Sequence, residues 1–276
     1  MKASDGQEIA CPTTGSGPAV VCVPGGPARA GEYLGDLGGL DASYTLHVLD
    51  NRGTGGSKPA DITTITVDRI AQDLVEVVEQ IGGRPFLLAH SFGTRVVAKA
   101  LAHEPDLAAA IVLVTPALAD SAQFDEGRAK VLDARDGDPA YADAIEAARA
   151  LPTARPRDVS MLFEMTVPLW YGSWDDAARQ HAAAARTQVD VRAAMAIRND
   201  LAQWTMPDLA AVEVPVLVVG GSLDFLTPPV AAHAAKDLFA DGTYAELEGA
   251  GHFPWLDDPE AFASIVDDFL SGDGLA

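Results

Sequence analysis

Ser91 lies where an apolar run ends and a helix-like pattern begins, in the segment LLAHSFGTRVVAKAL. A sharp turn between a buried strand and a helix strains the backbone of its central serine and lifts the hydroxyl clear of the sheet. The residues two positions away must be small so that strand and helix can approach, and here they are Ala89 and Gly93. This setting predicts a nucleophilic serine. An ordinary turn in which Ser91 caps the helix is the alternative.

A serine hydroxyl becomes a good nucleophile only when a base takes its proton. Among six histidines, His252 is the candidate because it follows the strand-like TYAELE and lies in a glycine-flanked loop before a helical pattern. Loops at the carboxyl ends of strands are where α/β sheets place reactive groups. We interpret the other five as ordinary strand, helix or surface residues, with the side chain of His90 on the other side of the turn: His47, His90, His103, His181 and His233.

The base needs a carboxylate to orient it. Asp224 comes just after the apolar segment VPVLVVG, one strand earlier in the chain than His252. The chain order Ser91, Asp224, His252 is that of one class of Ser-His-Asp enzymes. The sequence therefore predicts a catalytic triad, with a structural ion pair or a helix cap as the alternative role of Asp224.

Acyl transfer also needs hydrogen-bond donors for the oxyanion that develops in the transition state. One is the N–H of Phe92, directly after the serine. The other is expected in the glycine-containing loop CVPGGPARAGEY, where we predict the N–H of Gly26. Pro24 and Pro27 carry no N–H and cannot donate. A plain turn without this role is the alternative.

Short apolar segments, rich in β-branched residues, predict the strands that carry these loops. They span residues 18–23, 44–50, 85–90, 110–115 and 214–220. Helical patterns alternate with them, most clearly over residues 67–81, where the apolar residues share one helical face and two glycines follow. This alternation predicts an α/β fold, with a mostly parallel sheet and helices on both faces.

One long stretch breaks the alternation. Residues 119–208 contain no convincing strand and are rich in alanine with helical spacing. We interpret them as a helical cap, or lid, inserted into a core domain made of residues 1–118 and 209–276.

Composition excludes some classes of function. The net charge of −21 argues against binding of nucleic acid or of an anionic membrane, whose phosphates would be repelled. The chain shows no signal peptide and no long apolar span, so we expect a soluble, cytoplasmic protein with Cys11 and Cys22 as reduced thiols. No cluster of Cys and His has zinc-site spacing, so we expect neither metal nor cofactor. The oligomeric state stays open.

With these residues, the chain resembles the α/β-hydrolase superfamily along nearly its whole length, and within it the proline iminopeptidase-like serine hydrolases. That group carries His-Gly-Gly-Pro-Gly at its oxyanion loop. Residues 24–28 read Pro-Gly-Gly-Pro-Ala at the same place, so the first and last positions depart. The group's DQRG-x-G-x-S stretch is matched by residues 50–57, DNRGTGGS.

The resemblance implies that cap glutamates hold the free amino group of a substrate. The segment MLFEMTVPLWYGSWD is similar to the family's cap, which would make Glu164 one of them, while Phe225 stands where a second is often found. Glu164 could instead pair with an arginine of the cap, such as Arg157 or Arg198. The expected lining of the substrate pocket comprises Phe163, Leu169, Trp170, Tyr171, Trp204 and Phe225.

The resemblance thus implies a serine hydrolase that forms an acyl-enzyme, with aminopeptidase-like cleavage of an amide next to a free-amine aminoacyl group. Its substrate would be a small molecule or a short peptide-like compound. A carboxylesterase, lactonase or thioesterase acting on an apolar small molecule is the alternative. A third hypothesis is a non-catalytic binding protein on the same fold. The complete set of triad residues disfavours it.

Overall fold

The computed structural model describes residues 1–58, 61–119 and 121–272. Within them a seven-stranded sheet has the order β1-β3-β2-β4-β5-β6-β7. Every neighbouring pair is parallel except β1 and β3. The strands are β1 (Thr13–Gly15), β2 (Ala19–Val23), β3 (Thr45–Val48), β4 (Phe86–His90), β5 (Ile111–Val114), β6 (Val216–Gly221) and β7 (Gly242–Leu247).

The predicted strands are confirmed to within a few residues. Of these, β2, β4, β5 and β6 are buried on both faces, whereas β3 buries only alternate residues. Successive side chains of a strand point to opposite sides of the sheet. In β2, Val21 and Val23 face one apolar cluster, whereas Val20 and Cys22 face the other. No sequence pattern predicted β1, since its three residues are exposed and carry no apolar pattern.

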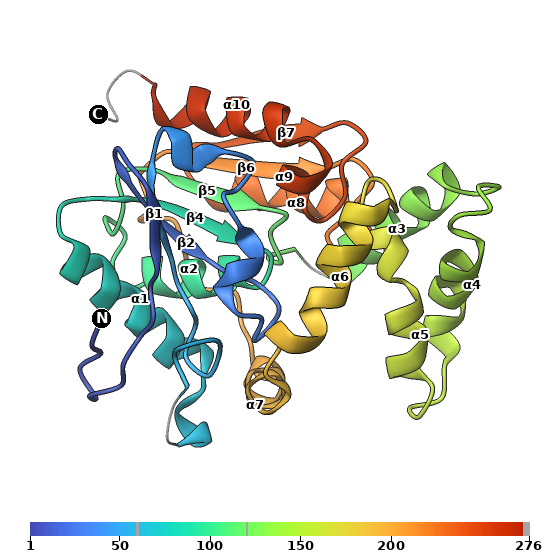
Figure 1. Cartoon of the computed structure of the whole chain (residues 1–276), viewed down its shortest axis with the longest axis horizontal. Helices are drawn as coiled ribbons and strands as arrows, with labels where there is room; N and C mark the ends of the chain where they lie inside the picture. The colour runs from blue at the N-terminus through green and yellow to red at the C-terminus, as the bar shows by residue number, and fades with distance from the viewer. Residues whose placement is uncertain (59–60, 120, 273–276) are drawn as a thin grey trace.

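Helices cover both faces of the sheet, as the alternation predicted. Figure 1 shows α10 (Pro259–Leu270) along one face and α1 (Val67–Ile81) with α2 (Gly93–Leu101) along the other. The helix α8 (Pro229–Ala235) packs into the same apolar cluster as α1 and α2, and the short α9 (Pro254–Asp257) lies on the α10 side. The predicted helix over residues 67–81 is confirmed, and Thr66 caps it by accepting a hydrogen bond from the N–H of Arg69.

The helical insertion runs between β5 and β6, and α3–α5 extend beyond one end of the sheet (Figure 1). Many of its buried residues, including Tyr141, Ile145 and Leu169, form a small apolar cluster that Phe225 joins from the core. Tyr171 and Ala178 pack into the core cluster on the α10 side of the sheet. At its end, α7 packs Ala193 and Ile197 into the main core instead. The helices are α3 (Ser121–Ala134), α4 (Ala142–Ala150), α5 (Val159–Met165), α6 (Asp176–Gln188) and α7 (Val191–Leu201).

Two side chains of the DNRGTGGS loop, Asp50 and Arg52, bind other parts of the fold. Oδ1 of Asp50 accepts a hydrogen bond of 2.7 Å from the N–H of Gly31, and Oδ2 accepts one of 2.8 Å from Gly56. Arg52, 1% exposed, binds Asp73 through two contacts of 2.7 Å. Removing one partner of such a buried ion pair costs about 3–5 kcal/mol, so this stretch is a structural anchor.

Over the part of the chain that the structure describes, no helix combines the length and the apolar character needed to cross a membrane.

Candidate active site

Ser91 occupies a strained turn between β4 and α2. Its φ angle is +52°, a left-handed conformation that serine rarely adopts. The turn is possible because its neighbours are small: a Cβ at Gly93 would overlap the carbonyl oxygen of Val23, and one at Gly25 would lie 2.9 Å from the Cβ of Ser91. The strained backbone therefore belongs to a residue whose polar side chain is partly exposed, as at many functional sites.

Asp224 and His252 form a buried pair at the ends of β6 and β7. Oδ2 of Asp224 lies 2.8 Å from Nδ1 of His252, and the two residues are 0% and 3% exposed. Oδ1 of the same carboxylate accepts hydrogen bonds from the N–H groups of Leu226 (2.7 Å) and Thr227 (2.9 Å). Because the carboxylate can only accept, Nδ1 carries the proton and leaves the lone pair of Nε2 free to act as a base.

His90 brings Ser91 and His252 into one neighbourhood. Nε2 of His90, the residue before the serine, lies 2.9 Å from the carbonyl oxygen of His252, and the two rings are 4.7 Å apart. Among the described residues, Ser91 Oγ makes no hydrogen bond to His252. In substrate-free enzymes such bonds are often long and tighten only when substrate binds. The predicted nucleophile and base thus lie at the same edge of the sheet.

Two backbone N–H groups were predicted to form the oxyanion hole, that of Gly26 in the loop after β2 and that of Phe92 directly after the serine. The N–H of Gly25 is occupied, because it donates to Oη of Tyr33 at 2.7 Å. The N–H groups of Gly26 and Phe92 donate no hydrogen bond to any residue that the structure describes. Gly26 has a φ of +126°, and a Cβ there would lie 2.7 Å from the N atoms of Ala28 and Arg29. Two candidate oxyanion donors therefore remain unpaired.

Two histidines interpreted as ordinary residues belong to a buried polar cluster next to this site. Nδ1 of His90 lies 2.6 Å from Oη of Tyr33, and Nδ1 of His181 lies 2.8 Å from Oη of Tyr171. Arg29 donates to the carbonyl oxygen of His181 at 3.0 Å. His90 is therefore more than an ordinary strand residue, because its side chain reaches the backbone carbonyl oxygen of His252. Position next to Ser91 was the only sequence signal for His90, and none marked His181.

Burial and nearby positive charge keep both histidines neutral. Desolvation is the main cause that lowers the pKa of His181 to about 3, and the guanidinium of Arg29 lowers it further. The pKa of His90 is also well below its usual value, first through burial and then through His252. Neither side chain therefore takes up a proton near neutral pH.

Some residues of the predicted pocket lie near His252. The carbonyl oxygen of Trp170 accepts a hydrogen bond of 2.7 Å from the N–H of His252. Phe163 is 43% exposed, and its ring is 5.3 Å from that of Trp170.

Other predicted pocket residues are packed into protein, and the expectation that they line a pocket needs correction. Tyr171 is 1% exposed and Leu169 is fully buried. The apolar side chain of Phe225 packs into the apolar cluster of the insertion. Trp204 lies beside α2, where the guanidinium of Arg95 is 5.5 Å from its ring.

Glu164 is exposed and pairs with an arginine of the insertion, though not with either of the two named from the sequence. Its side chain is 69% exposed, and Oε1 lies 3.3 Å from Nη2 of Arg186 on α6. Neither Arg157 nor Arg198 pairs with it among the described residues, and Arg157 contacts Asp158 instead. The apolar neighbours of Glu164 in the sequence do not bury it, because Met161, Phe163 and Met165 are themselves exposed on α5.

Within residues 1–58, 61–119 and 121–272, no group of three or more His, Cys, Asp or Glu side chains is arranged to hold a metal ion.

A mostly parallel sheet with a strained serine turn between a strand and a helix is typical of α/β hydrolases. Comparison with known protein families agrees with this class. The chain belongs to the alpha/beta hydrolase family, whose model matches residues 20–265. The resemblance to α/β-hydrolases is therefore confirmed.

Relatives of this chain carry different activities in their names. It is 30% identical over 265 residues to the polyketide synthase ThaQ of Burkholderia thailandensis, an alignment that covers 93% of this chain but only 12% of ThaQ. It superposes on the esterase RhEst1 from a Rhodococcus species with a TM-score of 0.75 and 24% identity, covering 99% of this chain and 98% of the other. It also matches the proline iminopeptidase-related protein TTHA1809 of Thermus thermophilus, with a TM-score of 0.68 and 26% identity over 96% and 97% of the two chains.

Proposed function

We propose that the protein is a serine hydrolase that forms an acyl-enzyme on Ser91. The observation that carries this proposal is the strained turn of Ser91 at the same sheet edge as the buried pair of Asp224 and His252. Nε2 of His252 makes no hydrogen bond to any described residue. A nucleophile on a strained turn beside an oriented base is the arrangement that acyl transfer needs.

The chemistry follows from these positions. Nε2 of His252 takes the proton of Ser91 as Oγ attacks the substrate carbonyl carbon. The N–H groups of Gly26 and Phe92 receive the negative charge on the carbonyl oxygen. His252 then gives its proton to the leaving group. Water next attacks the acyl carbon while Nε2 of His252 takes its proton, and that proton passes to Oγ of Ser91 as the bond between serine and the acyl group breaks. Asp224 holds the imidazole and stabilises its charged form.

For the substrate, we favour a carboxylic ester or thioester of an apolar acyl group. Binding a free ammonium group tightly calls for an anion shielded from water, because exposed ion pairs contribute about 0–1 kcal/mol. Glu164 is exposed and already paired with Arg186, and Phe225 is apolar. Phe163 and Trp170 offer apolar surface in the insertion, and the backbone of Trp170 adjoins His252. We propose that residues 119–208 act as a cap in this way.

The aminopeptidase-like activity predicted from sequence is the second candidate. It is favoured by the 26% identity with a proline iminopeptidase-related protein and by the place of Glu164 on α5, close to Trp170 in the chain. A substrate ammonium would then replace Arg186 as the partner of Glu164.

Kinetics on two substrate series separate the candidates. Short-chain p-nitrophenyl esters and aminoacyl p-nitroanilides are compared for wild type and Glu164→Gln. For an esterase, the esters are turned over, free-amine anilides are not, and the variant changes neither. For an aminopeptidase, Glu164→Gln lowers kcat/KM for free-amine substrates about tenfold to a hundredfold and spares N-acetylated ones.

The matched control is Glu126→Gln, which removes another exposed ion pair of the insertion, the one between Glu126 and Lys130. A selective loss for Glu164→Gln that Glu126→Gln does not share would overturn the esterase proposal.

A further inference from the structure

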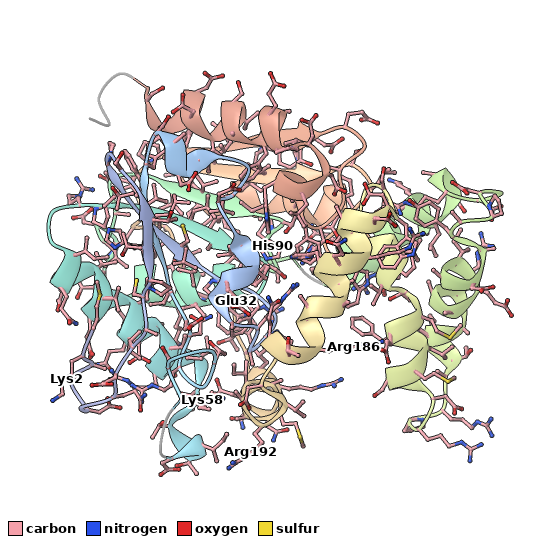
Figure 2. The ribbon with its side chains drawn as sticks, viewed as in Figure 1. Lys2, Glu32, Lys58, His90, Arg186 and Arg192 are labelled. Carbon is pink, nitrogen blue, oxygen red and sulfur yellow. The ribbon has the colours of Figure 1, made fainter. Side chains whose placement is uncertain are left out.

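A chain of three hydrogen bonds joins the two loops that flank Ser91. The N–H of Gly25 donates to Oη of Tyr33 at 2.7 Å, and that oxygen lies 2.6 Å from Nδ1 of His90. On the other side of the same ring, Nε2 of His90 lies 2.9 Å from the carbonyl oxygen of His252. Figure 2 shows His90 in the middle of the molecule, at the end of β4. One end of this chain is the proposed oxyanion loop and the other is the loop of the proposed base.

The chemistry of the two ends fixes the direction of every bond. A backbone N–H can only donate, so Oη of Tyr33 accepts from Gly25 and keeps its own proton to give away. A carbonyl oxygen can only accept, so Nε2 of His90 carries the ring proton. Nδ1 of His90 then has a free lone pair, which accepts the proton of Tyr33. Burial keeps His90 neutral, as this arrangement requires.

The chain leaves little freedom at either loop. A Cβ at Gly25 would lie 2.9 Å from the carbonyl oxygen of His90, so the loop is packed directly against the serine turn. The carbonyl oxygen of His252 accepts a second bond, of 3.2 Å, from Oγ1 of Thr115, while its N–H donates to Trp170. Both backbone groups of His252 are therefore held, in addition to its side chain.

We infer that Tyr33 and His90 are positioning residues, which hold the peptide of Gly26 and the loop of His252 in register around the hydroxyl of Ser91. The inference rests on the proposed function. Both residues act through groups that they hold in place. A displaced oxyanion donor costs transition-state stabilisation and leaves substrate binding unchanged.

The test compares two buried tyrosines. Tyr33→Phe removes the central oxygen of the chain and keeps the ring. Tyr44→Phe is the matched control, because Tyr44 is 4% exposed and its Oη donates to Asp267 at 2.8 Å, in another part of the fold. Tyr33→Phe should lower kcat for an ester about tenfold to a hundredfold with little change in KM. Tyr44→Phe should lower the melting temperature about as much as Tyr33→Phe does, and it should leave kcat at the wild-type value.

Two variants of His90 address the two ends of the chain. In His90→Gln the amide nitrogen can still reach the carbonyl oxygen of His252, but nothing accepts from Tyr33. In His90→Asn the amide oxygen can accept from Tyr33, but the side chain is too short to reach His252. Both should lower kcat. The double variant Tyr33→Phe/His90→Gln should lose no more than His90→Gln alone, because both changes break one connection.

A boronic acid, which forms a tetrahedral adduct with an active serine, supplies a second readout. Its inhibition constant should rise by the same factor by which kcat/KM falls. The inference is overturned if Tyr33→Phe keeps kcat within about twofold of wild type, or if boronate affinity does not follow the loss of activity.

Labelling by a fluorophosphonate separates this inference from the proposed function. If wild type is not labelled at Ser91, the proposed function fails and the inference fails with it. If wild type is labelled and Tyr33→Phe is labelled at the same rate, the inference alone fails.

Discussion

The carboxylate of Asp224 meets Nδ1 of His252 at 2.8 Å while its other oxygen is held by two backbone N–H groups. The backbone bonds fix the carboxylate, and the carboxylate fixes the ring of His252. With both side chains buried, neither the tautomer nor the direction of Nε2 is free to change. This pair gives the site its orientation before any substrate arrives.

The first prediction concerns this pair and the nucleophile. Ser91→Ala should lower kcat about 10⁴-fold or more, and Asp224→Asn about 10⁴-fold, because the asparagine favours the wrong imidazole tautomer. A fluorophosphonate probe followed by peptide mass spectrometry should find the label on Ser91 in wild type. Full activity in Ser91→Ala, or a label on a different serine, contradicts the assignment.

The second prediction concerns the oxyanion loop. Gly26→Ala should lower kcat about 10²- to 10³-fold, because the new Cβ would meet the N atoms of Ala28 and Arg29 at 2.7 Å and displace the proposed donor. Gly35→Ala is the control, since Gly35 also has a positive φ but no atom lies within 4 Å of a Cβ there. It should lose stability without losing kcat. Equal kinetic losses in both variants would argue against a donor at Gly26.

The third prediction concerns stability in acid. The pKa of His181 is about 3 in the folded chain and that of an unfolded histidine is about 6.5, so below pH 6.5 the unfolded state binds a proton that the folded state refuses. The free energy of unfolding should therefore fall as pH drops from about 6.5 towards 3.

His181→Gln removes the side chain that binds this proton in the unfolded state. Urea unfolding across that range should show a pH slope that is shallower by one proton in the variant. At about pH 8, where histidine is neutral in both states, the two slopes should agree. An identical slope at low pH would mean that His181 is protonated in the folded chain.

The fourth prediction concerns Asp257, which connects the insertion to the loop of the base. Oδ1 accepts from the N–H of Gly172 at 2.9 Å, and Oδ2 accepts from Gly251, the residue before His252, at 2.8 Å. Asp257→Asn turns one acceptor into a donor that faces an N–H. It should lower the free energy of unfolding by about 1.5–3 kcal/mol and also lower kcat.

Denaturant titration and ester kinetics measure the two effects of Asp257→Asn. A second aspartate serves as control: Asp258, whose side chain accepts, among the residues that the structure describes, only from the N–H of Ala261 at the start of α10. Asp258→Asn should cost stability alone. A loss of kcat in Asp258→Asn as large as that in Asp257→Asn would show that the connection to Gly251 has no special role.

Much of the fold could be predicted from local sequence because it depends on short-range patterns. The helix over residues 67–81 repeats its apolar residues at the helical period, and the strand at residues 86–90 is a short apolar run bounded by polar and small residues. The same holds for Ser91, whose turn needs small residues at fixed offsets. The residues that determine such features lie within about a dozen positions of one another, so the sequence alone is enough to predict them.

Only the tertiary structure decided which side chains meet. His90 touches a residue 162 positions away, and Arg29 binds Gln188 across 159 positions. Glu164 turned out to be exposed beside Arg186, although its neighbours in sequence are apolar. Burial and pairing are set by the packing of elements against one another, and no local pattern contains that information. The sequence by itself determined the fold class, the candidate nucleophile and the order of its proposed partners; packing decided how the loops around them are held.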